Sequence, residues 1–385
     1  MKKLFFILFL LIFLSCTAYA DEYSDLIDKY TEKYSEEIED GLPKEGIYSE
    51  YDFPRFDAEK IIGDAASGKP LFSFESIKDL LLKIFIPEIK STSKSMIYLF
   101  SVTMLGGFLL NLINSGMKSG AAQAGNMCIY LISAGVIANI FSEIMSVAYE
   151  AVNTLSLFLK TIFPVMIMSL FSAGCISSTY VLKPYLAAIV EICVHIIKTY
   201  LMPSLVLAFA TSAADCMSDK IKADKFVKFL TKSVKWALAS LLTIFTGVIG
   251  LQSVAASSFD GLTVKLTKLA TSNLVPIVGG LLSETVETVM NCSVVIKNSV
   301  GICGILGVVY ICIFPILRIG INVLFLRFSA AVLEPVGDEK VIKCLSSAAD
   351  VLSMLLGIVA SVAVMFVLII TIIINTGNSA VLLGR

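Results

Sequence analysis

Residues 351–375 read VLSMLLGIVASVAVMFVLIITIIIN, a run without one charged side chain. A helix needs about 20 apolar residues to cross the hydrocarbon core of a bilayer, which is about 30 Å thick. This run is therefore predicted to be a membrane-spanning helix. The whole chain has the same character, because 57% of its 385 residues are hydrophobic, only 16% are charged and the mean hydropathy is +0.86. Such a composition excludes an ordinary water-soluble globule and indicates a membrane protein.

Six more segments have the length and apolar character of membrane helices. Together with the first, the predicted segments are residues 96–115, 127–149, 155–175, 185–210, 236–257, 301–325 and 351–375. Their glycines and internal prolines are tolerated in membrane helices when neighbouring helices satisfy the freed backbone groups. The predicted fold is therefore all-α, a polytopic membrane helix bundle of about 6–7 transmembrane helices over residues 96–385.

The first 20 residues have the pattern of a secretory signal peptide. Lys2 and Lys3 precede an apolar core from Leu4 to Leu14, and Ala18-Tyr19-Ala20 fits the small-x-small cleavage site. Residues 1–20 are therefore predicted to be a signal peptide that is cleaved after Ala20. A lipid-modified Cys16 and an uncleaved anchor are the alternatives.

The segment of residues 21–95 is acidic, with 18 Asp or Glu against 10 Lys or Arg. Because it follows a signal peptide, it is predicted to be a small, mostly helical extracytoplasmic segment. Apolar side chains at helical spacing indicate one amphipathic helix that ends at Gly41-Leu42-Pro43 and another that is stopped by Pro87. Residues 44–70 are predicted to be a linker. So short a segment forms only a small core, and we expect it to lie against the membrane surface or a partner.

The connection 211–235 sets the orientation, because its charge is mostly positive. It carries six lysines and three aspartates. Basic loops lie on the cytoplasmic side, yet seven complete crossings from an outside N-terminal segment place this loop outside. One of the first four segments is therefore expected to be a re-entrant hairpin, with 155–175 and 185–210 as the best candidates.

Segment 185–210 contains Glu191, His195 and Lys198 at spacings of four and three, which places them on one helical face. A charge at the centre of a bilayer costs roughly 2.5 to 3.5 kcal/mol, so this face is expected to look into the bundle or a wet cavity. An internally compensated Glu191–Lys198 pair that fixes helix packing is the favoured interpretation. A proton or ion pathway is the alternative.

Residues 275–298 are less apolar, because Glu284 and Glu287 lie one helical turn apart in VPIVGGLLSETVETVMNCSVVIKN. Lys297 is too far along the chain to be a local partner of Glu287. We predict a re-entrant or interfacial segment whose acidic face lines a polar cavity or contacts another subunit. An amphipathic helix lying flat on the membrane surface is the alternative.

The sequence carries no recognisable signature of an enzyme or of a cofactor site. It has no GxxxxGK[ST] loop, no HExxH and no GxSxG, and its single histidine lies in an apolar segment. Its nine cysteines form no CxxC pair, which argues against a zinc site or a disulfide scaffold. We expect no catalytic residues, no metal, no cofactor and no nucleic-acid partner.

Two stretches, PIVGGLLSETVETVMNCSVVIKNSVG at residues 276–301 and LEPVGDEK at residues 333–340, resemble the stage III sporulation protein AE family of endospore-forming bacteria. The resemblance covers the chain from about residue 96 to the C-terminus. The positions that match the family pattern are Pro276, Gly279, Ser283, Cys292, Lys297, Asn298, Gly301, Glu334 and Pro335.

The resemblance implies a non-enzymatic subunit of the channel complex that links mother cell and forespore and is needed for forespore development. It implies residence in the mother-cell membrane around the forespore. The implied partners are other proteins of the same operon, including an ATPase and ring-forming subunits, and a forespore-side protein. A stand-alone secondary transporter is the alternative, because the charged face at Glu191 and the interrupted stretch at Pro276 could form the two halves of one midplane site.

Overall fold

The structure is a computed structural model that describes residues 32, 34–42, 56–71, 74–114, 119–172, 186, 188–217, 223–274, 279–335 and 338–383. Some side chains at helix ends, including those of residues 252–292, lie outside this description. Throughout the described residues, every regular element is a helix. The predicted all-α fold is therefore confirmed.

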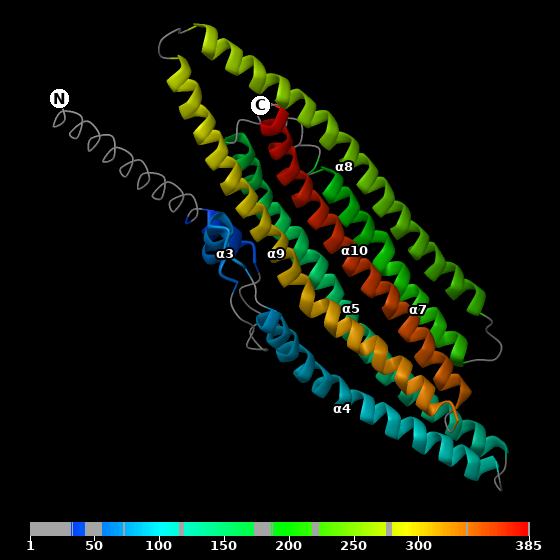
Figure 1. Ribbon diagram of the computed structural model, residues 1–385. Coiled ribbons are helices and arrows are strands. Elements are labelled where there is room, and N and C mark those ends of the chain that lie inside the picture. Colours follow the sequence, from blue (N-terminus) through cyan, green and yellow to red (C-terminus); the bar gives the residue numbers. More distant parts are fainter. Residues whose placement is uncertain are drawn as a thin grey trace, which may run out of the picture.

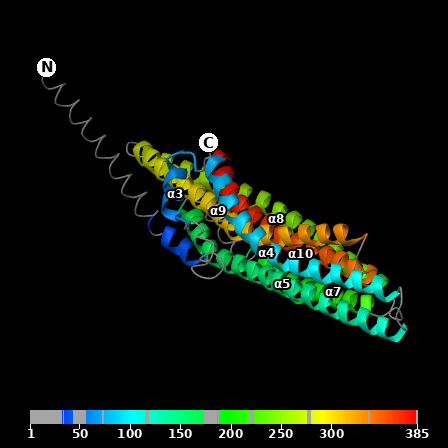
Figure 2. The ribbon, with the colours of Figure 1, turned by 90° about the horizontal axis from the view of Figure 1, so that it is seen from below.

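Most of the chain forms long helices that lie side by side (Figures 1 and 2). The helices are α3 (Ala58–Ala66), α4 (Phe74–Asn114), α5 (Ser119–Ser172), α7 (Met202–Met217), α8 (Asp224–Leu274), α9 (Gly279–Leu333) and α10 (Glu339–Leu383). Residues 188–196 are also helical and continue into α7 through a π-helical turn, η1 (Ile197–Leu201). The predicted signal peptide and most of residues 21–55 lie outside the described residues.

Five helices of the described part are long and apolar enough to cross a membrane, which confirms a polytopic bundle. They are Met127–Phe171, Ala188–Asp215, Asp224–Leu251, Ser293–Leu333 and Glu339–Asn375. At about 1.5 Å per residue, the 54 residues of α5 and the 55 of α9 span roughly 80 Å, well over the thickness of a hydrocarbon core. Parts of these helices therefore extend beyond the lipid.

Two predicted boundaries are not breaks in the structure. Segments 127–149 and 155–175 form one helix, α5, because the residues between them contain neither Gly nor Pro and stay helical. Similarly, the described part of segment 275–298 is continuous with segment 301–325 in α9, which begins at Gly279. The drop in hydropathy at these more polar stretches led to the predicted boundaries, but polar residues on one face do not end a helix.

Two predictions for the N-terminal part also need correction. Pro87 lies inside α4 and does not stop it. A proline removes one backbone hydrogen bond, but here the helix continues as Glu88, Thr92 and Met96 contact α9. The predicted linker 44–70 contains α3, whose N-cap Asp57 accepts a hydrogen bond from the backbone N–H of Lys60.

This N-terminal part packs against the bundle of the same chain. Ala58 and Ile62 of α3 are buried, and the ring of Phe56 meets Tyr310 of α9 edge-on, with the ring centroids 5.4 Å apart. Residues 34–40 are helical and end at a turn at Gly41, as predicted. The surface that we expected to meet the membrane or a partner thus meets α9, at least in part.

Three glycines let α9 approach its neighbours closely. A Cβ added at Gly301 would lie 2.3 Å from Ile374 of α10, and one added at Gly304 would lie 2.5 Å from Ile162 of α5. At Gly307 the clash would be with Cζ of Phe158, at 2.4 Å. Small residues at helix contacts are typical of membrane bundles, where close van der Waals packing drives helix association.

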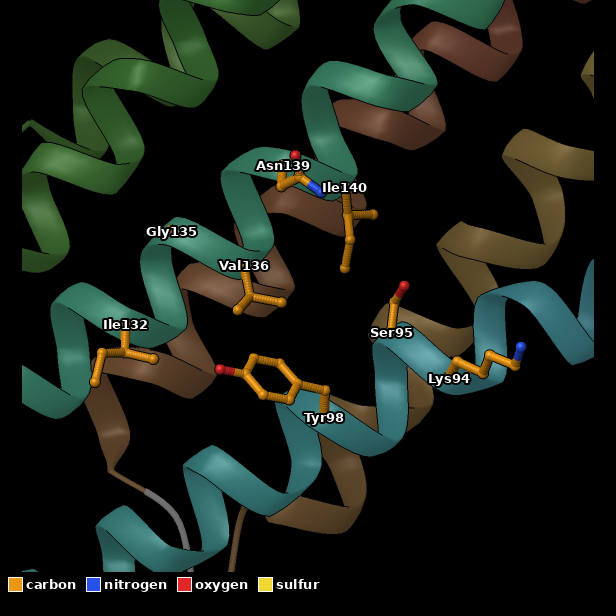
Figure 3. A pocket seen from close by; sticks show the side chains of 8 residues that line it. All are labelled: Lys94, Ser95, Tyr98, Ile132, Gly135, Val136, Asn139 and Ile140. Carbon is orange, nitrogen blue, oxygen red and sulfur yellow. The ribbon is translucent and has the colours of Figure 1, made fainter.

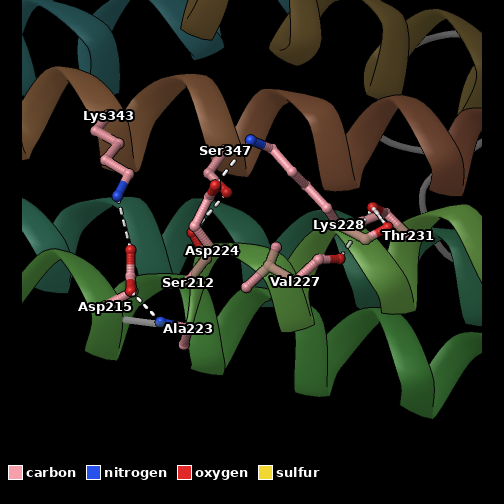
Figure 4. Close-up of polar contacts among 9 residues, drawn as sticks. All are labelled: Ser212, Asp215, Ala223, Asp224, Val227, Lys228, Thr231, Lys343 and Ser347. Atoms are coloured by element: carbon pink, nitrogen blue, oxygen red, sulfur yellow. Dashed lines mark hydrogen bonds and ion pairs between the residues drawn. The ribbon is translucent and has the colours of Figure 1, made fainter. Parts of the chain in front are cut away.

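One end of the bundle holds three pairs of successive helix ends: α4 with α5, α7 with α8, and α9 with α10 (Figure 1). There Asp215 of α7 accepts hydrogen bonds from Lys343 of α10, at 2.7 Å, and from the backbone N–H of Ala223 (Figure 4). The hydroxyl of Ser212 donates to Ser347 of α10. These contacts join the end of α7 to α10 and to Ala223, the residue before α8.

Candidate functional site

A charged cluster joins three helices in the bundle. Arg318 of α9 lies between Glu88 of α4 and Glu143 of α5, with its Nε 3.4 Å from Oε1 of Glu88 and its other end forming an ion pair with Glu143. Glu88 is 1% exposed, so its carboxylate is removed from solvent and lies next to this guanidinium. Arg318 therefore serves as the common counter-charge of two acids.

Polar side chains complete this cluster. Asn322, one turn after Arg318, donates to the carbonyl of Arg318 at 2.9 Å and contacts Thr92 Oγ1 at 3.5 Å. Thr92 in turn donates to Glu88 Oε1 at 3.4 Å. These contacts connect α4 to α9 through polar side chains.

Our interpretation of the sequence missed this cluster, although a signal was present. Arg318 and Glu143 are charges of opposite sign in two different predicted membrane segments, 301–325 and 127–149. Charges in membrane segments are rare and usually face one another or a cavity. Pairing such charges across segments, rather than within one, would have suggested the contact.

The predicted face of Glu191, His195 and Lys198 forms contacts with α5. Glu191 pairs with Lys160 at 2.9 Å, and Lys198 donates a hydrogen bond to Asn153 and lies 5.9 Å from the ring centroid of Tyr149. The favoured Glu191–Lys198 pair within one helix is thus replaced by two contacts between helices. The imidazole of His195 is exposed.

The π-helical turn η1 begins next to Lys198 and ends two residues before Pro203. A proline disturbs the hydrogen bond and the carbonyl of the preceding turn, and a π-bulge is one way to accommodate the extra space. Lys198 lies within this turn and contacts Asn153 and Tyr149 of α5.

Lys297 is completely buried between α9 and α10. Its Nζ donates a hydrogen bond of 2.7 Å to the carbonyl of Ile374. Glu284 and Glu287 belong to the same helix, ten or more residues before Lys297, and their side chains lie outside the described residues. The structure therefore places Lys297 in the contact between α9 and α10.

A groove of about 530 Å³ lies between α4 and α5 (Figure 3). It is lined by Lys94, Ser95, Tyr98, Ile132, Gly135, Val136, Asn139 and Ile140. The groove is open and combines a few polar groups with aliphatic walls. Across the described residues, no group of three His, Cys, Asp or Glu side chains is placed to hold a metal ion.

The fold and these sites define an all-α polytopic membrane protein whose charged groups bridge helices. The sequence pattern of the family described as Stage III sporulation protein AE matches residues 56–377, and the chain belongs to this family. It is similar to Stage III sporulation protein AE of Bacillus subtilis (strain 168), with 27% identity over 312 residues that cover 81% of this chain and 78% of the relative. No solved structure matches the chain.

The matched region extends further toward the N-terminus than the resemblance suggested. It begins at Phe56, so it includes α3 and all of α4. The contact of α3 with α9 therefore lies within the region that defines the family. Residues 1–55 lie before it.

Proposed function

We propose that this chain is a non-enzymatic, multi-pass membrane subunit of a channel complex that links mother cell and forespore and is needed for forespore development. The observation that carries the proposal is the family match over residues 56–377, which makes the protein a sporulation protein. The five apolar helices support a membrane location. The charged cluster at Arg318 supports a structural role, because it connects α9 with α4 and α5.

The partners that this function requires are other stage III sporulation proteins. Since the sequence has no nucleotide-binding loop of its own, an ATPase among them would supply energy. Ring-forming subunits and a forespore-side protein would continue the channel across the space between the two membranes. The protein itself would reside in the mother-cell membrane around the forespore.

The proposed orientation places the basic end of the bundle in the cytoplasm. Lys225, Lys228, Lys232 and Lys235 lie in the first turns of α8, and Lys340 and Lys343 lie at the start of α10. Helices α8 and α10 begin at the end of the bundle where α4, α7 and α9 end (Figure 1). Because α5 is one helix, it crosses the membrane once where two segments had been predicted. Residues 211–235 then lie on the same side as the α4–α5 connection, which removes the conflict with the positive-inside rule. The N-terminus of α4 would face outside.

A secondary transporter is less well supported. Such a transporter would have discontinuous helices in matching positions of two repeats. The charged face at Lys198 does have a π-helical turn, but α9 is continuous from Gly279 through Leu333. The break expected at Pro276 lies outside the described residues, so the second half of the expected midplane site stays a prediction.

The acidic face of Glu284 and Glu287 provides a test. We propose that it lines a polar path or a contact with another channel subunit. Replacing both residues with leucine in a strain that lacks the native gene should leave protein abundance intact, because the change removes roughly 5 to 7 kcal/mol of insertion penalty. Heat-resistant spore counts should nevertheless fall sharply.

The matched control replaces Glu36 and Glu37, two exposed acids outside the family region, with leucine. It should sporulate like the wild type. Normal sporulation of the Glu284/Glu287 variant at normal abundance would reject the proposed role of this face, and normal sporulation of the gene deletion itself would reject the proposed function.

A further inference from the structure

A polar stripe follows the exposed side of α5. Glu143, Ser146, Glu150, Asn153 and Lys160 are all exposed, and their spacings of three, four, three and seven keep them on one slowly winding face. They belong to the candidate membrane span Met127–Phe171. A helix with such a face cannot present it to lipid without a large penalty.

The neighbouring helix continues this stripe. Lys160 pairs with Glu191 at 2.9 Å, Asn153 accepts a hydrogen bond from Lys198, and the ring of Phe141 stacks on Phe209 with centroids 4.0 Å apart. Residue numbers fall along α5 as they rise along residues 188–217, so the two helices are antiparallel. Asn153 and Lys198 lie close to the midpoints of their two spans, Met127–Phe171 and Ala188–Asp215. We call the surface formed by Glu150, Asn153, Lys160, Glu191, His195 and Lys198 the α5/α7 face, because residues 188–196 and η1 continue into α7.

The α5/α7 face is incomplete within one chain. Glu150 and His195 are exposed, and neither forms an ion pair or a side-chain hydrogen bond with any described residue. The side chains of Lys160 and Glu191 are still 59% and 60% exposed despite their pairing. Polar groups at this depth need water or protein around them, because hydrocarbon offers no hydrogen-bond partners.

An apolar groove of about 450 Å³ adjoins the stripe. It is lined by Met145, Tyr149, Lys198, Met202, Pro203, Val206, Leu207 and Ala210. Exposed side chains such as Leu207 and Tyr149 give the groove walls that another helix could pack against. A polar stripe beside an apolar groove is typical of a protein contact surface rather than of a surface bathed only by water.

We propose that a second copy of this chain binds the α5/α7 face, about a two-fold axis parallel to the helices. Two copies inserted in the same direction are related by a rotation about the membrane normal, which keeps every residue at its own depth. The α5 helix of one copy then faces residues 188–217 of the other. Because Lys198 bonds to Asn153, it lies about one helical turn from the level of Glu150.

The charges on this surface are self-complementary under that rotation. Glu150 of each copy meets Lys198 of its partner copy, so one isologous contact forms two ion pairs. This gives the carboxylate of Glu150 a counter-charge that no described residue of the single chain supplies. The contact depends only on this chain and would form whether or not the proposed channel complex exists.

The test uses two differently tagged full-length copies, produced together in the membranes of a host without other sporulation proteins. We expect one tag to co-isolate the other from a mild detergent. Glu150→Lys and Lys198→Glu should each reduce this co-isolation by roughly tenfold, because like charges then face each other across the contact. The double variant should recover to within about threefold of the wild type, because the same two pairs form with exchanged signs.

The control exchanges the charges of Arg327 and Asp350, an exposed ion pair that joins α9 to α10. Arg327→Glu and Asp350→Lys should leave co-isolation unchanged. A second readout avoids charge reversal: Glu150→Cys in one copy and Thr199→Cys in the other should give an oxidative cross-link between the tags. Ile244→Cys, exposed on α8, replaces Thr199→Cys as the control and should give none.

Three results would overturn the proposal: wild-type copies that do not co-isolate, single reversals that leave co-isolation unchanged, or cross-linking no greater than that of the Ile244→Cys control. In the second case, loss of sporulation by the single reversals would mean that a different protein occupies the α5/α7 face.

Discussion

Replacing Arg318 with leucine is expected to destabilise the protein by about 3 to 5 kcal/mol, because the change removes the cation that lies beside a buried carboxylate. Glu88 is 1% exposed and lies 3.4 Å from the Arg318 guanidinium, so no solvent can replace the lost charge. Glu143, which is about half exposed, would lose an ion pair but is not enclosed by protein as Glu88 is. The variant should accumulate poorly in membranes, and the purified protein should unfold at lower denaturant concentration than the wild type.

Two comparisons separate this effect from a general intolerance of substitution. Arg327→Leu breaks an exposed ion pair on the same helix and should change stability by about 0 to 1 kcal/mol. Adding Glu88→Leu to Arg318→Leu should restore most of the lost stability, because a buried pair can often be replaced by apolar residues. A mild Arg318→Leu phenotype, equal to that of Arg327→Leu, would mean that the cluster does not hold α4 to α9.

Gly307→Leu is expected to separate α5 from α9. A Cβ at this position would lie 2.4 Å from Cζ of Phe158, whose ring is fully buried and cannot move into open space. Overpacking of a dense core costs about 1 to 3 kcal/mol, and the larger leucine side chain places this substitution at the upper end. Thermal unfolding or protease resistance of the purified protein in detergent would measure the loss.

Gly320 offers the matched control on the same helix. A Cβ there meets nothing within 4 Å, so Gly320→Leu should be neutral or slightly stabilising, since leucine is a better helix former than glycine. Phe158→Ala should partly rescue Gly307→Leu by freeing the space that the leucine needs. Equal effects of the Gly307 and Gly320 substitutions would contradict the close approach of α5 and α9.

The sequence predicted the class of fold because apolar runs such as 351–375 are long enough to cross a membrane, and a helix satisfies its own backbone hydrogen bonds in lipid. It predicted helix continuity less well. Hydropathy reports where side chains prefer lipid, whereas helix ends depend on backbone-breaking residues, and none occurs between Glu150 and Thr154 of α5. The short helix α3 was also missed, although Asp57 before an apolar turn and Gly68 in a left-handed conformation after it are ordinary cap residues.

The charged sites show what local spacing can and cannot predict. Glu191, His195 and Lys198 do share a helical region next to α5, but Glu191 pairs with Lys160 of α5. Arg318 meets Glu88 and Glu143, each more than 170 positions away in the chain, and no spacing rule connects such residues. Contacts of this kind depend on which helices are neighbours, and that order is set by packing details such as Gly304 and Gly307.

Isolation of the tagged full-length protein from sporulating cells tests whether this membrane bundle is a subunit of a sporulation channel complex. The chain is extracted in a mild detergent, and its co-isolated proteins are identified by mass spectrometry. The double variant Arg318→Leu/Glu88→Leu, which we expect to fold, is isolated in the same way for comparison. We predict that the wild type brings with it other stage III sporulation proteins, including an ATPase and a ring-forming subunit. Isolation of an abundant, folded chain without any other stage III sporulation protein would contradict the account.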